Sequence, residues 1–172
     1  DEGAYNIDVV EQGNGQWCLM DRKTLQVGGV HDKVEFCDIY GSKELLHVKH
    51  YGSSSVLGQL FNQGLVSGEL LRSHVDYVRL ANEKLGATHQ LHFEASVPRD
   101  VSQYTIVFAI ISQSDKPGLH LPFFAKVVLK SVCSRLRDLG YGAVMLAKIE
   151  CERDHVLVRR LPSQEPRRRR QR

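Results

Sequence analysis

The first half of the chain alternates between apolar and polar residues in short segments, which predicts strands. Residues 17–23 (WCLMDRK), 34–40 (VEFCDIY) and 45–51 (LLHVKHY) have the two-residue period of a strand. The residues GSKE between the last two segments predict a tight turn, so these segments should pair as an antiparallel hairpin. Residues 1–16 are polar and dotted with glycine, and a short helix is expected near residues 2–10.

Two helices are predicted after the hairpin. Residues 53–55 (SSS) offer N-cap hydroxyls to the segment 56–72 (VLGQLFNQGLVSGELLR), whose apolar residues recur at helical spacing. We expect Gly64 to interrupt this helix. A second helix is predicted over residues 74–85 (HVDYVRLANEKL) and should end at Gly86.

The second half of the chain predicts a strand, a helix and a strand. Residues 105–112 (TIVFAIIS) form a continuous apolar run, typical of a strand that is buried on both faces. An amphipathic helix is expected over residues 123–139 (FFAKVVLKSVCSRLRDL), and residues 143–149 form another apolar strand. Together the segments predict an α/β fold, a mixed β-sheet flanked by helices, in a single domain of residues 1–165.

Composition and charge narrow the class of protein. Of the 172 residues, 42% are hydrophobic and 25% are charged, as in ordinary globular domains, and no apolar run is long enough to span a membrane. The net charge of +3 is smaller than the contribution of the five arginines in residues 166–172 (PRRRRQR), so the rest of the chain is slightly acidic. We expect residues 166–172 to form a disordered basic tail, either solvated or in contact with phosphates. An additional edge strand is expected before the tail, at residues 155–160 (HVLVRR).

The four cysteines do not form a CxxC pair, and each has apolar neighbours in the sequence. This pattern favours unpaired buried thiols over a disulfide or a zinc site. Unpaired thiols are typical of a reducing compartment, so we expect a cytoplasmic protein. The cysteines are Cys18, Cys37, Cys133 and Cys151.

The predicted hairpin brings three polar residues to one face of the sheet. With the turn centred on GSKE, Asp38 lies opposite His47 and Phe36 lies opposite Lys49. Lys49 is two residues beyond His47, so both side chains point to the same side as Asp38. Charged groups in a sheet are costly unless they are paired or bind a metal. The residues therefore form either an Asp38–His47 ion pair, with Lys49 reaching solvent, or a metal-dependent catalytic site.

A metal-dependent phosphodiesterase needs the residue types of this hairpin. The metal requires oxygen ligands such as Asp38, and a lysine such as Lys49 can orient the attacking water and balance developing charge. Asp21, on the neighbouring strand, is expected to join the same site. Gln59 and Gln63 stand one turn apart on the following helix, where we expect them to contact nucleic acid.

The acid on one strand and the x-Lys pair on the next resemble the active site of the PD-(D/E)xK nuclease superfamily, which has a restriction-endonuclease-like core. LLHVKHY followed by a helix is also similar to the corresponding segment of methylation-dependent restriction enzymes. The resemblance implies that Asp38 is the first acid, that Lys49 is the catalytic lysine and that His47 replaces an expected Glu, Asp or Gln. It also implies a divalent metal, Mg or Mn, held by Asp38, with His47 as an atypical ligand or as a proton acceptor, and the imidazole suits manganese better than magnesium. Asp21 is expected as a further metal ligand, because its strand should lie beside the hairpin.

The tripeptide Asp21-Arg22-Lys23 provides a second match to the same superfamily, with Asp8 as its upstream acid. We rank this match second because the segment around Asp8 is a weak strand. Lys23 is still expected to contact nucleic acid, since its strand should lie beside the hairpin.

A closer resemblance extends over almost the whole chain. The segment LMDRK and the blocks CDIYGSKELLHVKHYGSSSVLGQLFNQGLVSGELL and LPFFAKVVLKSVCSRLRDLGY are similar to the C-terminal part of a sporadically distributed bacterial protein family of unknown function. This family is longer than the present chain, so the resemblance implies an N-terminal domain of the same protein as a partner. Sporadic distribution implies mobile genetic elements and defence against foreign DNA.

Two functional hypotheses follow. The first is a metal-dependent nuclease-like domain that acts on DNA in defence. The second is a catalytically inactive module of the same fold that binds nucleic acid or protein. The two differ in whether a further carboxylate, from Asp21, Glu2 or Glu69, converges on Asp38.

Overall fold

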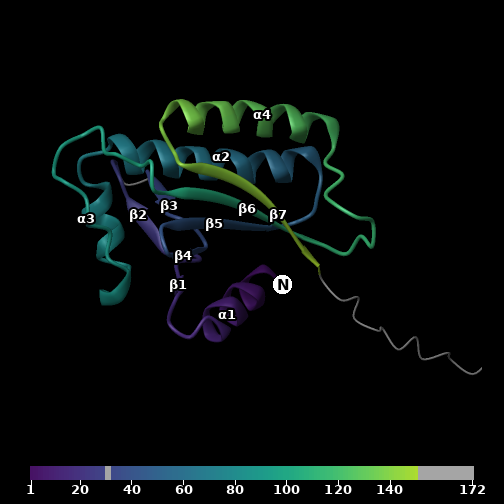
Figure 1. The fold of residues 1–172 in the computed structure, drawn as a ribbon, viewed down its shortest axis with the longest axis horizontal. Helices are drawn as coiled ribbons and strands as arrows, with labels where there is room; N and C mark the ends of the chain where they lie inside the picture. Colours follow the sequence, from purple (N-terminus) through teal and green to yellow (C-terminus); the bar gives the residue numbers. More distant parts are fainter. Residues whose placement is uncertain (30–31, 151–172) are drawn as a thin grey trace, which may run out of the picture.

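A computed structural model describes residues 1–29 and 32–150 (Figure 1). The helices are α1 (Glu2–Gln12), α2 (Ser54–Ser73), α3 (Tyr77–Asn82) and α4 (Phe123–Asp138), with a single 3-10 turn, η1 (Ala87–His89). The strands are β1 (Cys18–Leu19), β2 (Thr24–Gln26), β3 (Lys33–Glu35), β4 (Ile39–Gly41), β5 (Glu44–His50), β6 (Thr105–Ser112) and β7 (Ala143–Glu150). The expected edge strand at residues 155–160, the basic tail and Cys151 lie outside the described residues.

A mixed sheet of five strands forms the centre of the molecule, in the order β1-β4-β5-β6-β7. Strands β1, β4 and β5 are antiparallel, and β5, β6 and β7 are parallel. Figure 1 shows α2 and α4 side by side over one face of this sheet and α1 on the other face. The predicted α/β fold with a mixed sheet flanked by helices is therefore confirmed. Strand β6 has the bounds that its apolar run predicts, and seven of its eight residues are buried.

The hairpin of β4 and β5 has the predicted turn and register. Gly41 pairs with Glu44, and Ile39 pairs with Leu46. The two turn residues between the strands have positive φ, 50° at Ser42 and 66° at Lys43. Positive φ at both central residues is the geometry of a type I′ turn, whose twist matches that of the flanking strands.

The segment 34–40 is not the single strand that its alternation predicts. The segment forms two short strands in different sheets. Strand β3 pairs with β2 in a separate two-stranded sheet, and β4 belongs to the five-stranded sheet. Phe36 lies in the break, where it is fully buried and its carbonyl oxygen accepts a hydrogen bond from the Ser67 hydroxyl of α2. The predicted pairing of Phe36 with Lys49 is therefore wrong. The segment 17–23 is broken in the same way, into β1 and a turn that leads to β2.

Gly64 does not interrupt α2, which continues without a break from Ser54 to Ser73. The glycine is required by packing, because a Cβ atom at this position would lie 2.5 Å from Cε1 of Phe108 on β6 and 3.2 Å from Cδ2 of His47 on β5. The missing side chain lets the helix lie close against the sheet at the point where β5 and β6 run side by side.

Replacing Gly64 with alanine should destabilise the protein by about 1–3 kcal/mol, because the added methyl group collides with two buried rings. Gly58 is a matched control on the same helix, since a Cβ atom there would meet only Val128, at 3.9 Å. Gly58→Ala should be neutral or stabilise by up to about 1 kcal/mol through helix propensity. Urea denaturation of both variants measures the difference, and equal effects would refute the role assigned to Gly64.

Two apolar clusters hold the layers together. The larger cluster lies between the sheet and the helices α2 and α4 and includes Phe36, Leu57, Phe61 and Phe108. The smaller cluster lies between the sheet and α1, and it contains four buried residues, Ile39, Val48, Ala109 and Ile111, with Tyr5, Val9, Val10 and Trp17 packed against it. Helix α1 therefore rests on a much smaller apolar contact than α2 does.

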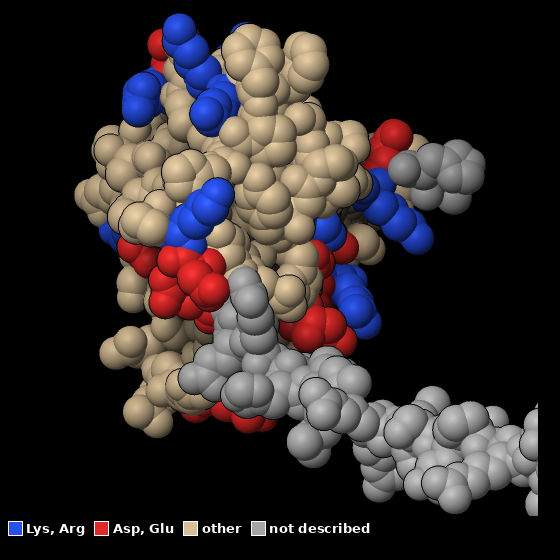
Figure 2. Space-filling view, turned by 90° about the vertical axis from the view of Figure 1, so that its right-hand side faces the viewer, with Lys and Arg blue, Asp and Glu red and all other residues tan. Residues whose placement is uncertain are grey.

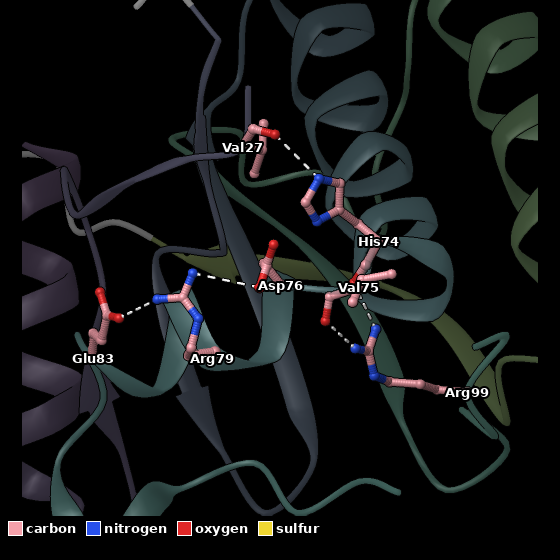
Figure 3. Close-up of polar contacts among 7 residues, drawn as sticks. All are labelled: Val27, His74, Val75, Asp76, Arg79, Glu83 and Arg99. Carbon is pink, nitrogen blue, oxygen red and sulfur yellow. Dashed lines mark hydrogen bonds and ion pairs between the residues drawn. The ribbon is translucent and has the colours of Figure 1, made fainter. Parts of the chain in front are cut away.

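A buried arginine closes the C-terminal end of α2. Arg99 is 5% exposed, and its guanidinium donates hydrogen bonds to the carbonyl oxygens of Leu71 and His74, both at 2.9 Å. A third bond, at 2.7 Å, reaches the carbonyl oxygen of Val75 (Figure 3). The last carbonyl groups of a helix have no partner within the helix, so Arg99 supplies the missing donors. His74 also hydrogen-bonds the carbonyl oxygen of Val27 through Nε2, at 3.1 Å, which ties the β2–β3 sheet to α2.

Three of the cysteines, Cys18, Cys37 and Cys133, are free thiols, as predicted. Within residues 1–29 and 32–150, no helix combines the length and the apolar character that are needed to cross a membrane. The expectation of a cytoplasmic location stays a prediction.

Candidate functional site

The carboxylate of Asp38 lies against the backbone of β5, between His47 and Lys49. Asp38 stands immediately before β4, and its backbone N–H donates to the carbonyl oxygen of Leu46 at 2.9 Å, which continues the hairpin by one residue. Its Oδ2 accepts a hydrogen bond from the backbone N–H of Val48 at 2.6 Å. The predicted juxtaposition of the acid with the His-Val-Lys segment is thus present, and the turn register is its cause.

Burial raises the pKa of Asp38 to about 6, since the charged carboxylate is removed from water. The hydrogen bond from Val48 acts in the opposite direction, and the negative charges of Asp21, Glu35 and Glu2 raise the pKa further. Asp21 and Glu2, two of the three carboxylates that the sequence nominates, therefore lie near enough to Asp38 to raise its pKa. The ionised form of Asp38 is therefore unfavourable in the folded protein, and a bound cation would stabilise it.

Lys49 is held by a glutamate from the other side of the sheet. Glu2, in the first turn of α1, accepts a hydrogen bond from Lys49 Nζ on Oε2 at 3.0 Å and from the backbone N–H of His50 on Oε1 at 2.9 Å. Burial acts to raise the pKa of Glu2, but the His50 amide and the Lys49 ammonium outweigh it and leave the pKa below its ordinary value. The side chain of Lys49 is one-third exposed (34%), so it does not simply extend into solvent.

His47 is buried and neutral. Its side chain packs against Phe108, with the ring centres 6.1 Å apart, and burial lowers the pKa of its imidazole to about 4. Its Nε2 atom is buried without a hydrogen-bond partner. The structural alternative predicts an ion pair between Asp38 and His47, and the described residues contain no such pair. A buried nitrogen without a hydrogen-bond partner lowers the stability of the folded protein unless a ligand supplies the missing hydrogen bond.

Asp21 approaches the same region through the backbone and through α1. Its N–H donates to the carbonyl oxygen of Asp38 at 2.9 Å, and its carboxylate lies 4.0 Å from Arg22 Nε. A Cβ atom built on Gly3 would lie 3.6 Å from Asp21 Oδ2, so this carboxylate faces the first turn of α1, the turn that carries Glu2. Asp21 therefore lies near the N-terminal end of α1, where Glu2 binds Lys49.

The second sequence match to the superfamily does not assemble. Lys23 turns away from the hairpin, and its Nζ lies 3.4 Å from the carbonyl oxygen of Lys84, beyond the end of α3. Asp8 is exposed on α1 rather than placed on a strand. The Asp21-Arg22-Lys23 tripeptide therefore contributes only Asp21 to the candidate site.

A pocket of about 420 Å³ opens beside Asp38, between α2 and the β2–β3 sheet. Of the predicted site residues, Asp38, His47, Gln59 and Gln63 line it, whereas Lys49, Asp21 and Lys23 do not. The structure thus divides the predicted site into two parts that share Asp38. One part is the pocket on the α2 side, and the other is the group of Glu2, Asp21 and Lys49 at the first turn of α1.

Within the described part of the chain, no group of three or more His, Cys, Asp or Glu side chains is arranged to hold a metal ion. Magnesium and manganese sites that act on phosphates commonly use only one or two carboxylates, with water and the substrate completing the shell. Asp38 and Asp21, whose backbones are joined by a hydrogen bond, provide carboxylates of this type. Figure 2 shows the side of the molecule where β7 ends, and acidic side chains gather there in groups with Lys and Arg projecting next to them.

The sequence analysis does not predict the contact of Glu2 with Lys49, and it does not nominate Asn62. Glu2 is recognisable only as an acid in the first turn of a helix, and its contact with Lys49 depends on where that helix docks. Asn62 lines the pocket beside Gln59 and Gln63. Its spacing of three residues from Gln59 places it on the same helix face, and this spacing is the signal that could have found it.

The fold and the site define an α/β protein with a mixed sheet, an acid-bearing hairpin and an adjoining pocket. The chain belongs to a protein family described as "Family of unknown function (DUF6119)", whose family model matches residues 1–150. Searches of the curated proteins and of the solved structures find no match to the chain. Membership of a family of unknown function agrees with the prediction, whereas the sporadic distribution and the PD-(D/E)xK resemblance stay predictions.

Proposed function

We propose that the chain is a metal-dependent nuclease-like domain with a restriction-endonuclease-like core, which cleaves DNA at Asp38 and Lys49. The observation that carries the proposal is the hydrogen bond of 2.6 Å from Val48 N–H to Asp38 Oδ2. It places an acid from one strand beside the His47-x-Lys49 pair of the next, as the superfamily resemblance requires. The proposed role in defence rests on the family resemblance, and the proposed cytoplasmic location rests on the unpaired thiols.

The carboxylates of this site would hold the metal, and the lysine would act on the water. Asp38 with Asp21 or Glu2 offers hard oxygen ligands, and a divalent cation bound there would supply charge neutralisation and an activated water. Since the pKa of Asp38 is about 6, its carboxylate is ionised at neutral pH and protonated in acid. Glu2 binds the Lys49 ammonium at 3.0 Å. From this position the ammonium would turn to contact a water or a phosphate oxygen of the substrate.

One observation favours the second candidate, a catalytically inactive binding module of the same fold. His47 occupies the position where the superfamily resemblance implies Glu, Asp or Gln, and it is buried and neutral. A neutral imidazole brings no negative charge to a magnesium ion. Under this alternative the domain binds DNA through the pocket side and leaves the phosphodiester intact.

Cleavage of plasmid DNA with Mn²⁺ or Mg²⁺ tests the proposal. Lys49→Ala should keep Mn²⁺ binding and lower the cleavage rate by about 10²–10³-fold, since the lysine acts on the water. Asp38→Asn should lose both Mn²⁺ binding, measured by calorimetry, and cleavage. The matched controls are Asp8→Asn and Lys130→Ala, exposed residues on α1 and α4 that should change neither quantity. A wild-type protein that binds DNA but neither binds Mn²⁺ nor cleaves would support the inactive module instead.

A further inference from the structure

The pocket beside Asp38 has a wall of amide side chains. Gln59, Asn62 and Gln63 all line it and all come from the exposed face of α2, at spacings of three and four residues. Each amide carries both hydrogen-bond donors and an acceptor. Three amides in one pocket can therefore match a ligand edge on which donors and acceptors alternate.

Two valines and a histidine complete the surfaces that a ligand would meet. Val66 lines the pocket from α2 and is 42% exposed, and Val34 lines it from β3 on the other wall. His47 also lines the pocket and is 4% exposed, with its Nε2 atom lacking a hydrogen-bond partner. The pocket thus has apolar surfaces on two walls, with the buried ring of His47 beside them.

The charges of the pocket exclude an anionic occupant. The carboxylates of Asp38 and Glu35 both line it, against one lysine, Lys33. A phosphate placed between these carboxylates would be repelled, so the pocket suits a flat, neutral group with several hydrogen-bonding atoms. The phosphates of the same ligand would lie outside, on the side of Lys49.

We infer that this pocket binds a single unstacked nucleobase of the DNA strand whose phosphate lies at Asp38 and Lys49. The inference rests on the proposed nuclease function and names the part of the substrate that the α2 side recognises. A nucleobase is flat and neutral, and its edges carry the donors and acceptors that Asn and Gln side chains bind. Its volume fits a pocket of about 420 Å³ with room for the adjoining sugar.

A single-stranded oligonucleotide with one 2-aminopurine provides the test, because this base fluoresces weakly when stacked and strongly when unstacked. The full chain carrying Lys49→Ala is titrated into the oligonucleotide with EDTA present, so that neither cleavage nor metal binding contributes. We expect the fluorescence to rise several-fold at saturation. In a parallel NMR titration, the side-chain amides of Asn62 and Gln63 and the His47 ring nitrogens should shift.

Variants separate the pocket from general DNA binding. Gln63→Ala and Asn62→Ala, each added to Lys49→Ala, should weaken the fluorescence-detected affinity about tenfold, as expected for loss of a hydrogen bond in a desolvated site. Gln12→Ala is the matched control, an exposed amide on α1 that is not part of the pocket. The two exposed pocket amides make no contact that folding requires, so their loss should leave the melting temperature unchanged.

Failure of this inference can be told apart from failure of the nuclease proposal. DNA cleavage by the wild type without a rise in 2-aminopurine fluorescence would overturn the nucleobase pocket and leave the nuclease standing. A rise that is sensitive to Gln63→Ala, in a protein that never cleaves, would support the pocket and overturn the nuclease. Equal effects of Gln63→Ala and Gln12→Ala would also overturn the pocket.

Discussion

Replacing Asp38 with asparagine should stabilise the folded protein at neutral pH by about 2–3 kcal/mol. The pKa of Asp38 is about 6 in the folded protein, against an ordinary value of 3.8, so the folded state binds this proton more tightly than the unfolded state. The ionised carboxylate therefore destabilises the fold, and stability falls as the pH rises from about 4 to 6. Asparagine has no proton to lose, and its oxygen can still accept the hydrogen bond from Val48.

His47→Gln should change the pH dependence in the opposite sense. The pKa of His47 is about 4 in the folded protein, against 6.5 ordinarily, so the folded state binds this proton less tightly and loses stability as the pH falls from 6.5 to 4. In the wild type the two effects oppose each other. Asp38→Asn alone should leave a stability that rises with pH over this range, and His47→Gln alone should leave one that falls.

Urea denaturation across this pH range measures both slopes, with Asp8→Asn, an exposed acid on α1, as the control that should alter neither. If Asp38→Asn were less stable than the wild type at neutral pH, Asp38 would have a stabilising partner that its raised pKa excludes. If replacing Asp38 does stabilise the protein, the residue contributes to binding or chemistry rather than to folding.

Arg99→Ala should cost about 3–5 kcal/mol of unfolding free energy. The substitution removes the Arg99 donors to the carbonyl oxygens of Leu71 and Val75, and it leaves His74 O with only the backbone N–H of Tyr77. Water does not replace these donors readily, because Arg99 is 5% exposed. The substitution also removes the cation that lies 5.9 Å from the ring centre of Phe93. Thermal and urea denaturation measure the loss.

Arg79→Ala is the matched control, because Figure 3 shows a second arginine nearby that uses its charge differently. Arg79 pairs with Asp76 at 3.5 Å and with Glu83 at 2.6 Å, but its side chain is 61% exposed. Exposed ion pairs contribute little, so this variant should lose less than about 1 kcal/mol. Similar losses of unfolding free energy for the two variants would mean that the buried hydrogen bonds of Arg99 contribute no more than an exposed ion pair.

The parts of the fold that sequence predicts are those decided by local pattern. Strand β6 follows from its apolar run, and the Asp38–His47 register follows from the number of residues in the turn. Alternation does not predict the break between β3 and β4, which falls at Phe36 and Cys37, two consecutive residues that are both buried. Two neighbours that point into the core cannot belong to one regular strand with a single buried face.

The missed features of the site depend on packing between distant segments. Gly64 predicts a helix break by propensity, but the rings of Phe108 and His47 beneath it require the glycine within a continuous helix. Glu2 reaches Lys49 only because α1 docks on the face of the sheet opposite α2. No local pattern near Lys49 reports that contact, so the sequence could nominate the glutamate but could not place it.

The small apolar contact beneath α1 has a consequence for hydrogen exchange. Segments with few buried contacts open locally at a lower free energy than the whole protein unfolds. The amides of α1 should therefore exchange with solvent faster than those of β6, whose residues are almost all buried. Each such opening would carry Glu2 away from Lys49 while the sheet stays intact, so the lysine would alternate between a carboxylate-bound and a free ammonium within the native ensemble.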